Sequence, residues 1–282
     1  MPVAGQEGGA DNDPFRILRV NPLPMIRVLR EFEGGIRLFF HVAMRIGTLR
    51  RPAMRESFLR QVYFTGVTAA TGLVLRASTV GALIIAFMIT VLDADAELAV
   101  KMLLWVVMRE IGPLAAALVV ILRSGTAVAS ELAMMRISGQ TDALRHMGID
   151  PYDYLVIPRV IGVMLATAAL TLYIQFLAVL GGMLLSPFVI NASFDELLSR
   201  FFELVTPVDL YYSMIKSLLF GFAIMNVCCY HGLNPPDLTQ NAVPKAVTRA
   251  VTQSAMVVLV INAVFAYLVF GVLFYGLITA KV

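Results

Sequence analysis

The sequence has few of the residues that catalysis and nucleotide binding require. Its 282 residues include two cysteines, three histidines and one tryptophan, and only 15% of them are charged. No segment matches G-x-x-x-x-G-K-S/T, the loop that holds the phosphates of ATP, so no P-loop is predicted here. The hydrolase pattern G-x-S-x-G and the zinc pattern H-E-x-x-H are also missing. We therefore predict that this chain is not an enzyme and has no cofactor, catalytic residue or metal site.

The few cysteines and histidines do not form a recognisable site. Cys228 and Cys229 are neighbours inside an apolar run, where cysteine acts as a small hydrophobic side chain. His41, His146 and His231 are far apart in the sequence, which disfavours a catalytic or metal-binding cluster.

Apolar residues are what the chain has in excess, at 59% of the total, with a mean hydropathy of +0.81. A soluble domain is about half apolar and about one quarter charged. A helix that crosses a bilayer needs about 20 mostly apolar residues, and five runs are long enough: 62–92, 98–122, 160–185, 208–230 and 251–279. The sequence predicts an all-α polytopic membrane protein with five transmembrane helices, in a domain over residues 51–282.

The region before the first run has a different character. We predict that residues 1–22, which begin MPVAGQEGGADNDP, form a disordered cytoplasmic tail and not a signal peptide, because they have acids and no apolar core. Residues 23–50 carry apolar side chains every three or four positions, with arginines beside them. This pattern predicts an amphipathic helix in the membrane interface that contacts anionic lipid, not nucleic acid. A core helix of a small soluble domain is the alternative.

Basic residues predict the orientation of the chain. Residues 1–60 contain ten arginines, and the connection 123–159 contains four. The connections 93–97 and 186–207 hold only Arg200 between them. The positive-inside rule places the N-terminus, 123–159 and 231–250 in the cytoplasm. Five spans then place the C-terminus on the periplasmic side.

The connection after the second run contains a short predicted helix, at about residues 138–148. Ser138 is suited to cap its start and Gly148 to end it. Asp142 and Arg145 are spaced to pair on one face. Periodicity alone leaves two interpretations open, a cytoplasmic linker and a docking helix for a partner.

The sequence from 109 to 160, REIGPLAAALVVILRSGTAVASELAMMRISGQTDALRHMGIDPYDYLVIPRV, closely resembles the permease subunits of the MlaE/Mce-associated ABC transporter family. The resemblance extends to about residues 50–275. The family's pattern is matched at Arg109, Glu110, Gly112, Pro113, Glu131, Leu132, Met135, Arg136, Gln140, Asp142, Ala143, Leu144, Met147, Gly148, Asp150, Pro151, Pro158 and Arg159.

The resemblance implies a specific function. Two permease copies would form a dimer, and each would meet a cytoplasmic ATPase, which binds ATP and Mg²⁺, through the short helix. The dimer would pass phospholipid to or from a periplasmic MCE-domain protein, in the inner membrane of a diderm bacterium. A small STAS-domain protein is a further possible partner. The residues expected to couple to the ATPase are Glu131, Arg136, Gln140, Asp142, Leu144, Arg145, Met147, Gly148 and Asp150.

One segment departs from the family's pattern. After Leu233 the family usually has a glycine-rich run, but residues 234–252 here lack those glycines and contain Pro244. Proline restricts the backbone where glycine permits many conformations. A different partner set or a heterodimer is therefore an open expectation.

Ionisable residues inside apolar runs are costly and suggest function. Our candidates for a lipid pathway are Arg109, Glu110 and Arg76. The guanidinium group of Arg109 would bind a phosphate headgroup. A structural clamp between spans is the alternative for Arg109 and Glu110. For Lys216 we favour a side chain that extends to the membrane surface. The competing function is an ion-coupled secondary transporter, in which Arg109 and Glu110 would serve ion coupling.

Overall fold

The computed structural model describes residues 104–185 and 205–279, with side chains as far as residue 268, and scattered positions between 63 and 101 and at 199 and 203. Over this part the chain is helical and has no strand, which confirms the all-α prediction. The predicted tail 1–22, the interfacial helix 23–50 and Arg76 lie outside the described residues.

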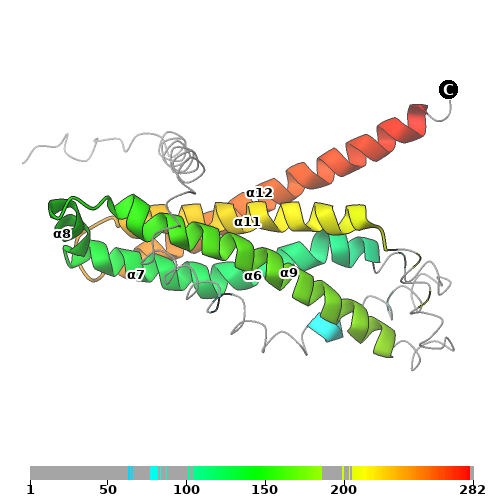
Figure 1. Cartoon of the computed structure of the whole chain (residues 1–282), viewed down its shortest axis with the longest axis horizontal. Coiled ribbons are helices and arrows are strands. Elements are labelled where there is room, and N and C mark those ends of the chain that lie inside the picture. Colours follow the sequence, from blue (N-terminus) through cyan, green and yellow to red (C-terminus); the bar gives the residue numbers. More distant parts are fainter. Residues whose placement is uncertain are drawn as a thin grey trace, which may run out of the picture.

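The described helices follow one another along the chain (Figure 1). The order is η4 (Val107–Ile111), α6 (Gly112–Val120), η5 (Ile121–Gly125), α7 (Thr126–Ile137), α8 (Gln140–His146), η6 (Tyr152–Val156), α9 (Ile157–Leu185), α11 (Pro207–Leu233) and α12 (Ala242–Thr279), where η marks a π-helical turn.

Among the described residues, four helices are long and apolar enough to cross a membrane. They are Leu104–Ile137, Tyr152–Leu184, Pro207–Leu233 and Ala242–Leu268, so the second to fifth predicted runs are confirmed as helices. The protein is therefore a multi-pass membrane protein.

The end predicted for the second of the five runs, at residue 122, was wrong. Its helix continues to Ile137, and the connection before the next helix is correspondingly shorter. The continuation contains charged residues that lower its hydropathy, but Ala129 and Leu132 on its inner face are fully buried. Packing against the bundle therefore supports helix where hydropathy predicted a connection.

Helix α11 lies at the centre of the bundle and packs on α9, α12 and α7. Glycines permit the close approach: a Cβ at Gly221 would lie 2.6 Å from Thr167 Oγ1, and one at Gly232 would lie 2.8 Å from Leu132 Cβ. Cys228 and Cys229 are fully buried in this core, as predicted for small apolar side chains. Small residues thus let the helices approach closely. Close packing is the expected source of helix association in a membrane, where the hydrophobic effect does not drive helices together.

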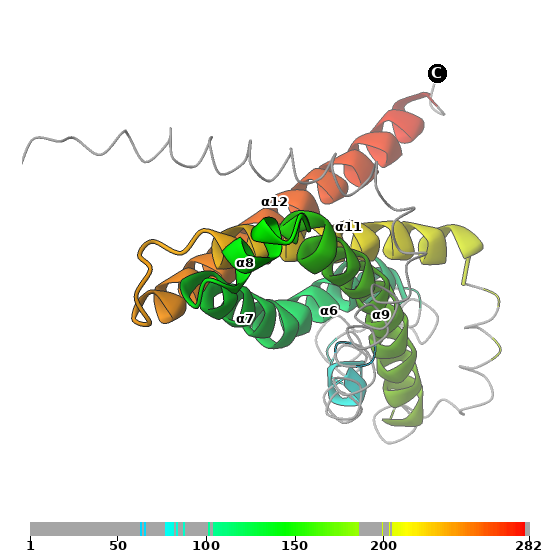
Figure 2. The same cartoon turned by 60° about the vertical axis from the view of Figure 1, so that its left-hand side comes forward.

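Helix α8 lies at one end of the bundle, where α7 ends and the helix that contains α9 begins (Figure 2). Gly139 and Gly148 flank it, and both have φ of +75°, a conformation that glycine adopts without strain. Gly148 ends the helix as predicted, but the prediction for Ser138 was wrong. Gly139 occupies the N-cap, because the sharp turn between the helices requires a positive φ just before Gln140. Ser138 Oγ instead donates to Met134 O at 2.9 Å, in the last turn of α7.

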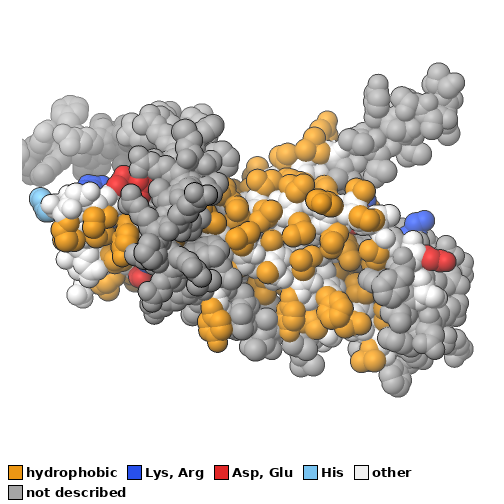
Figure 3. All heavy atoms as spheres, in the orientation of Figure 1, with side chains coloured by type: hydrophobic (Ala, Val, Ile, Leu, Met, Phe, Trp, Pro, Cys, Tyr) orange, Lys and Arg blue, Asp and Glu red, His pale blue; other side chains and the backbone are white. Residues whose placement is uncertain are grey.

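Helix α12 leaves the bundle along its C-terminal half (Figures 1 and 2). Its most apolar stretch is 11% buried, against 50–56% for the other three spans. Apolar side chains cover the body of the molecule, and charged ones lie toward its two ends (Figure 3). The exposed apolar residues of α12 are Met256, Leu259, Val260, Val264, Tyr267 and Leu268.

Candidate functional site

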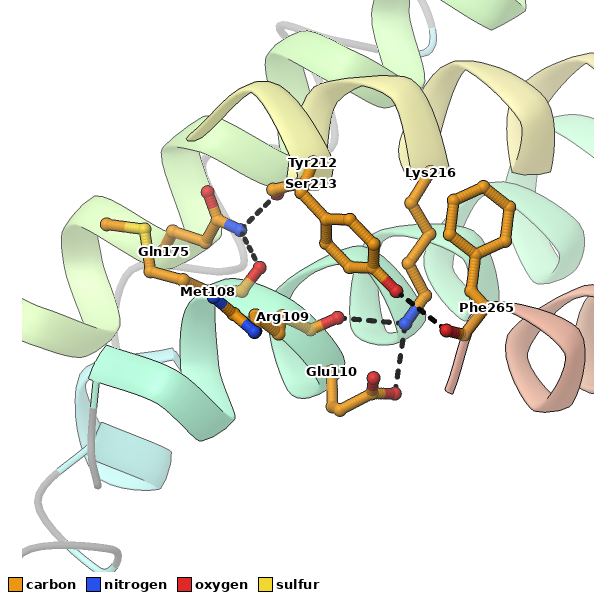
Figure 4. Close-up of polar contacts among 8 residues, drawn as sticks. All are labelled: Met108, Arg109, Glu110, Gln175, Tyr212, Ser213, Lys216 and Phe265. Atoms are coloured by element: carbon orange, nitrogen blue, oxygen red, sulfur yellow. Dashed lines mark hydrogen bonds and ion pairs between the residues drawn. The ribbon is translucent and has the colours of Figure 1, made fainter. Parts of the chain in front are cut away.

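Two groups of polar residues lie at opposite ends of the bundle. The first surrounds η4, which carries Arg109 and Glu110 and packs against the first turns of α11 (Figure 4). The second surrounds α8. The π-helical turn η4 of the first group contains one residue more than an α-helical turn, and such turns are frequent at functional sites.

Arg109 is held by an acid on α11. Its Nη2 lies 2.6 Å from Asp209 Oδ1, and its Nε donates to the same oxygen at 2.7 Å. Both side chains are about four-fifths buried. Asp209 is the third residue of α11, and Thr206 Oγ1 hydrogen-bonds its other oxygen. Arg109 is therefore close to the end of the bundle that is remote from α8, and it joins two spans.

Lys216 is fully buried and does not extend to the surface, so the preferred prediction for it was wrong. Its Nζ lies 2.9 Å from Glu110 Oε2 and donates to Arg109 O at 2.8 Å. At 1.5 Å per residue, Lys216 lies about 14 Å along α11 from Pro207, which is too deep for easy escape to water. A partner inside the protein compensates the charge instead.

Tyr212 connects these charges to α12. The ring centroid lies 6.0 Å from Arg109 Cζ and 5.8 Å from Lys216 Nζ, within the range of cation–π attraction. The hydroxyl donates to Phe265 O at 3.2 Å, and the Tyr212 and Phe265 rings meet edge to face at 5.5 Å. Trp105 is a further ring near Arg109, at 5.9 Å.

Gln175 of α9 ties a third span to the cluster. Its Nε2 donates to Met108 O at 2.9 Å and to Ser213 Oγ at 2.5 Å. The carbonyl groups of Met108 and Arg109, both on the π-turn, thus accept bonds from side chains of other helices. The cluster is a polar network inside an apolar bundle, and it links η4 with α9, α11 and α12.

The group around α8 contains two ion pairs. Asp142 pairs with Arg136 of α7 at 2.5 Å, so the predicted pairing of Asp142 with Arg145 was wrong. The turn at Gly139 folds α8 back toward the end of α7, and Arg136 is then the nearer base. Glu131 accepts from Arg159 Nη2 at 2.8 Å, which joins α7 to α9 next to α8.

The remaining predicted coupling residues lie on or beside α8. Met147 is 65% exposed and Ile149 is 39% exposed, while Leu144 is partly buried against the core. Gln140, Arg145 and Gly148 are exposed. Asp150 Oδ1 accepts from Tyr152 N at 2.9 Å and so begins the next helix. α8 is therefore a short helix whose outer surface combines Met147 with charged side chains of both signs, Arg145 and Asp142.

The family model described as "Permease MlaE" matches residues 58–268, which is most of the chain. The chain belongs to the MlaE permease family. It is 30% identical over 242 residues to a probable ABC transporter permease protein of Rickettsia felis, covering 85% of this chain and 92% of that protein. It is 35% identical over 164 residues to such a protein of Rickettsia prowazekii, covering 58% of this chain and 63% of that protein.

The chain of this MlaE-family permease also resembles a plant protein. It is 39% identical over 125 residues to "Protein TRIGALACTOSYLDIACYLGLYCEROL 1, chloroplastic" of Arabidopsis thaliana, covering 44% of this chain and 36% of that protein.

In the atypical segment 234–252, Pro244 is the third residue of α12. Proline is tolerated in a first turn, where the N–H has no partner in the helix.

Sequence reasoning on this permease missed Asp209 and Tyr212, and it placed Lys216 wrongly. A signal for Asp209 was present: the second and fourth runs are separated by one other run and so cross the membrane in the same direction. An acid at the start of the fourth run can therefore meet a base near the start of the second. Nothing in the sequence pattern indicates that Tyr212 reaches the backbone of α12.

Proposed function

We propose that this permease is the membrane subunit of an ABC transporter that moves phospholipid or a related lipid. A separate ATPase binds ATP and Mg²⁺ and docks on α8 from the cytoplasm. The lipid passes between the bacterial inner membrane and an MCE-domain protein in the periplasm. The name of the Arabidopsis relative contains that of a lipid, which supports this substrate class.

The main support for this proposal is the way α8 is connected to its neighbouring membrane spans. α8 is seven residues long and lies between two membrane spans. Arg136–Asp142 ties it to α7, and Glu131–Arg159 ties α7 to α9. A push from a partner on α8 would reach both spans, because α8 is connected to one through Gly139 and to the other through Gly148. Met147 is 65% exposed and follows the exposed His146, in the connection between the two spans.

The ionic cluster at the other end is proposed as the part of the lipid pathway that faces the periplasm. Asp209 takes two of the five N–H donors of Arg109. Three donors remain on a side chain that is 23% exposed, and they match the oxygens of a phosphate headgroup. Arg76 would contribute from the first span.

The poor burial of α12 supports a second copy of the chain as a partner. Buried residues make up 11% of its most apolar stretch, and Asn262 Oδ1 has no partner among the described residues. A homodimer would cover this face and enclose an apolar space for lipid. An MCE-domain protein, and a STAS-domain protein on the ATPase, complete the proposed assembly.

Reconstitution tests the proposal. The permease and its co-purified ATPase, in liposomes with labelled phospholipid, should transfer lipid to an acceptor protein only with ATP. Met147→Asp should abolish ATP-dependent transfer and ATPase association, since it places a charge in the docking surface. Met147 is a cleaner test site than Leu144, whose substitution would also disturb the core.

Lys245→Glu is the matched control, because Lys245 is 62% exposed and lies on the same side as α8. It should retain transfer. Lipid transfer by the permease alone, driven by an ion gradient and independent of ATP, would instead support the secondary transporter. In that case Glu110 and Lys216 would be the ion-coupling pair.

A further inference from the structure

A small cavity lies between α8 and the end of α11. Its volume is about 40 Å³, and its lining includes Arg136, Thr141, Arg145, Tyr152 and Asn234. A wider, open hollow of about 440 Å³ adjoins it, and Arg145 and Tyr152 line both. A cavity of this size accommodates a small polar group, and it opens beside the outer surface of α8.

Thr141 indicates that a polar group belongs in the cavity. It is the buried residue of α8 and is 2% exposed. Its Oγ1 has no hydrogen-bond partner in the part of the chain that the structure describes. Buried hydroxyl groups nearly always have a partner, and this one can either donate or accept.

The charges around the cavity favour an anion. Arg136 uses one N–H in its bond to Asp142, which leaves four of its five donors. Arg145 forms no ion pair within the described part of the chain. The nearby Asp150 carboxylate accepts the Tyr152 N–H. The lining of the small cavity therefore holds two guanidinium groups and no acid. Asp142 pairs with Arg136 and Asp150 lines the adjoining hollow, so Arg145 is the base that has no acidic partner within the described residues.

We propose that a carboxylate from the partner ATPase, on an Asp or Glu side chain, occupies this cavity. It would bind between Arg136 and Arg145 and accept a hydrogen bond from Thr141 Oγ1. The inference rests on the proposed docking of an ATPase on α8 and identifies the chemistry of that contact. A protein side chain is favoured over a lipid phosphate, because the cavity is small and the neighbouring hollow is lined by both apolar and charged residues, among them Ile149 and the acid Asp150. A folded surface fills such a hollow while one side chain enters the cavity.

Zero-length crosslinking tests this contact in the assembled complex. Arg145→Lys keeps the charge and supplies an amine, which a carbodiimide joins to a carboxylate in direct contact. We expect a crosslink between residue 145 and one acidic residue of the ATPase, identified by mass spectrometry. Lys245 and Asp237, 3.9 Å apart, provide an internal positive control for the reaction.

The possible outcomes separate this proposal from the one on which it rests. If no ATPase co-purifies with the unmodified permease, both fail. If the complex forms and Lys245 couples to Asp237, but residue 145 couples to no ATPase carboxylate, the carboxylate contact alone is overturned. Loss of a bound anionic phospholipid in Arg145→Gln, with unchanged ATPase affinity, also overturns it.

Thr141→Val provides an independent test, since it removes the hydroxyl and keeps the shape. The isolated permease should be no less stable, because the hydroxyl has no internal partner. Its affinity for the ATPase should fall about tenfold or more, the loss expected for a hydrogen bond to a charged group. Thr252→Val is the control, because Thr252 is exposed and its hydroxyl bonds Thr248 O. An affinity of Thr141→Val within about twofold of the unmodified value would contradict the proposal.

Discussion

The ion pair between Lys216 and Glu110 is unequally buried, and the two partners should therefore respond differently to substitution. The Lys216 side chain is 0% exposed and that of Glu110 is 32% exposed. Without Glu110, the buried ammonium group keeps one hydrogen-bond acceptor among the described residues, Arg109 O at 2.8 Å. Without Lys216, the Glu110 carboxylate still reaches the protein surface.

The expected losses follow from this asymmetry. Removing one partner of a buried ion pair costs about 3–5 kcal/mol. We expect about 3 kcal/mol for Glu110→Ala, because Glu110 is one third exposed and one acceptor remains. Lys216→Met replaces the charge by an apolar side chain of similar length and should cost about 1 kcal/mol. The double variant should lose no more than about 1.5 kcal/mol, less than Glu110→Ala alone, because it leaves no buried charge unpaired.

The measurement is reversible unfolding by SDS in mixed micelles. Trp105 is the sole tryptophan of the chain and lies 5.9 Å from Arg109 Cζ, so its fluorescence reports on this region, and circular dichroism reports on the whole bundle. Losses that simply add in the double variant, or a smaller loss for Glu110→Ala than for Lys216→Met, would refute the reasoning.

Two further substitutions separate steric from backbone effects, and the cysteines give a test of burial. Gly221→Ala should lose about 1–2 kcal/mol of stability in the same assay, because the new Cβ would lie 2.9 Å from Met164 Cα and overpacking outweighs the gain in helix propensity. Gly139→Ala should lose about 1 kcal/mol because alanine is strained at a φ of +75°. The loss would come from the backbone alone, because the new Cβ would meet no atom within 4 Å. Equal stability of both variants and the parent would contradict this reasoning. Cys228 and Cys229 should resist maleimide until SDS unfolds the chain, because both are fully buried, and rapid labelling in mild detergent would show that the core opens.

Hydropathy alone determined that the chain is a helical membrane protein, and the described parts of the second to fifth runs lie within helices of the structure. It predicted helices reliably because a long apolar segment must satisfy its own backbone hydrogen bonds in lipid. The positive φ of Gly148 was also predictable, since glycine tolerates a left-handed turn at the end of a helix. The motif of residues 109–160 indicated the family, and the match over residues 58–268 confirms it.

Tertiary structure decided which charges meet. Asp142 and Arg145 are correctly spaced on one helix, but the turn at Gly139 brings Arg136 closer to Asp142. Lys216 looked able to reach water along its own helix, but its pairing with Glu110 depends on how α11 packs against η4. Hydropathy is a property of each segment in lipid, whereas ion pairs between spans depend on rotation and depth relative to neighbouring helices. Rotation and depth are set by packing between helices, so they cannot be predicted from the sequence of one helix alone.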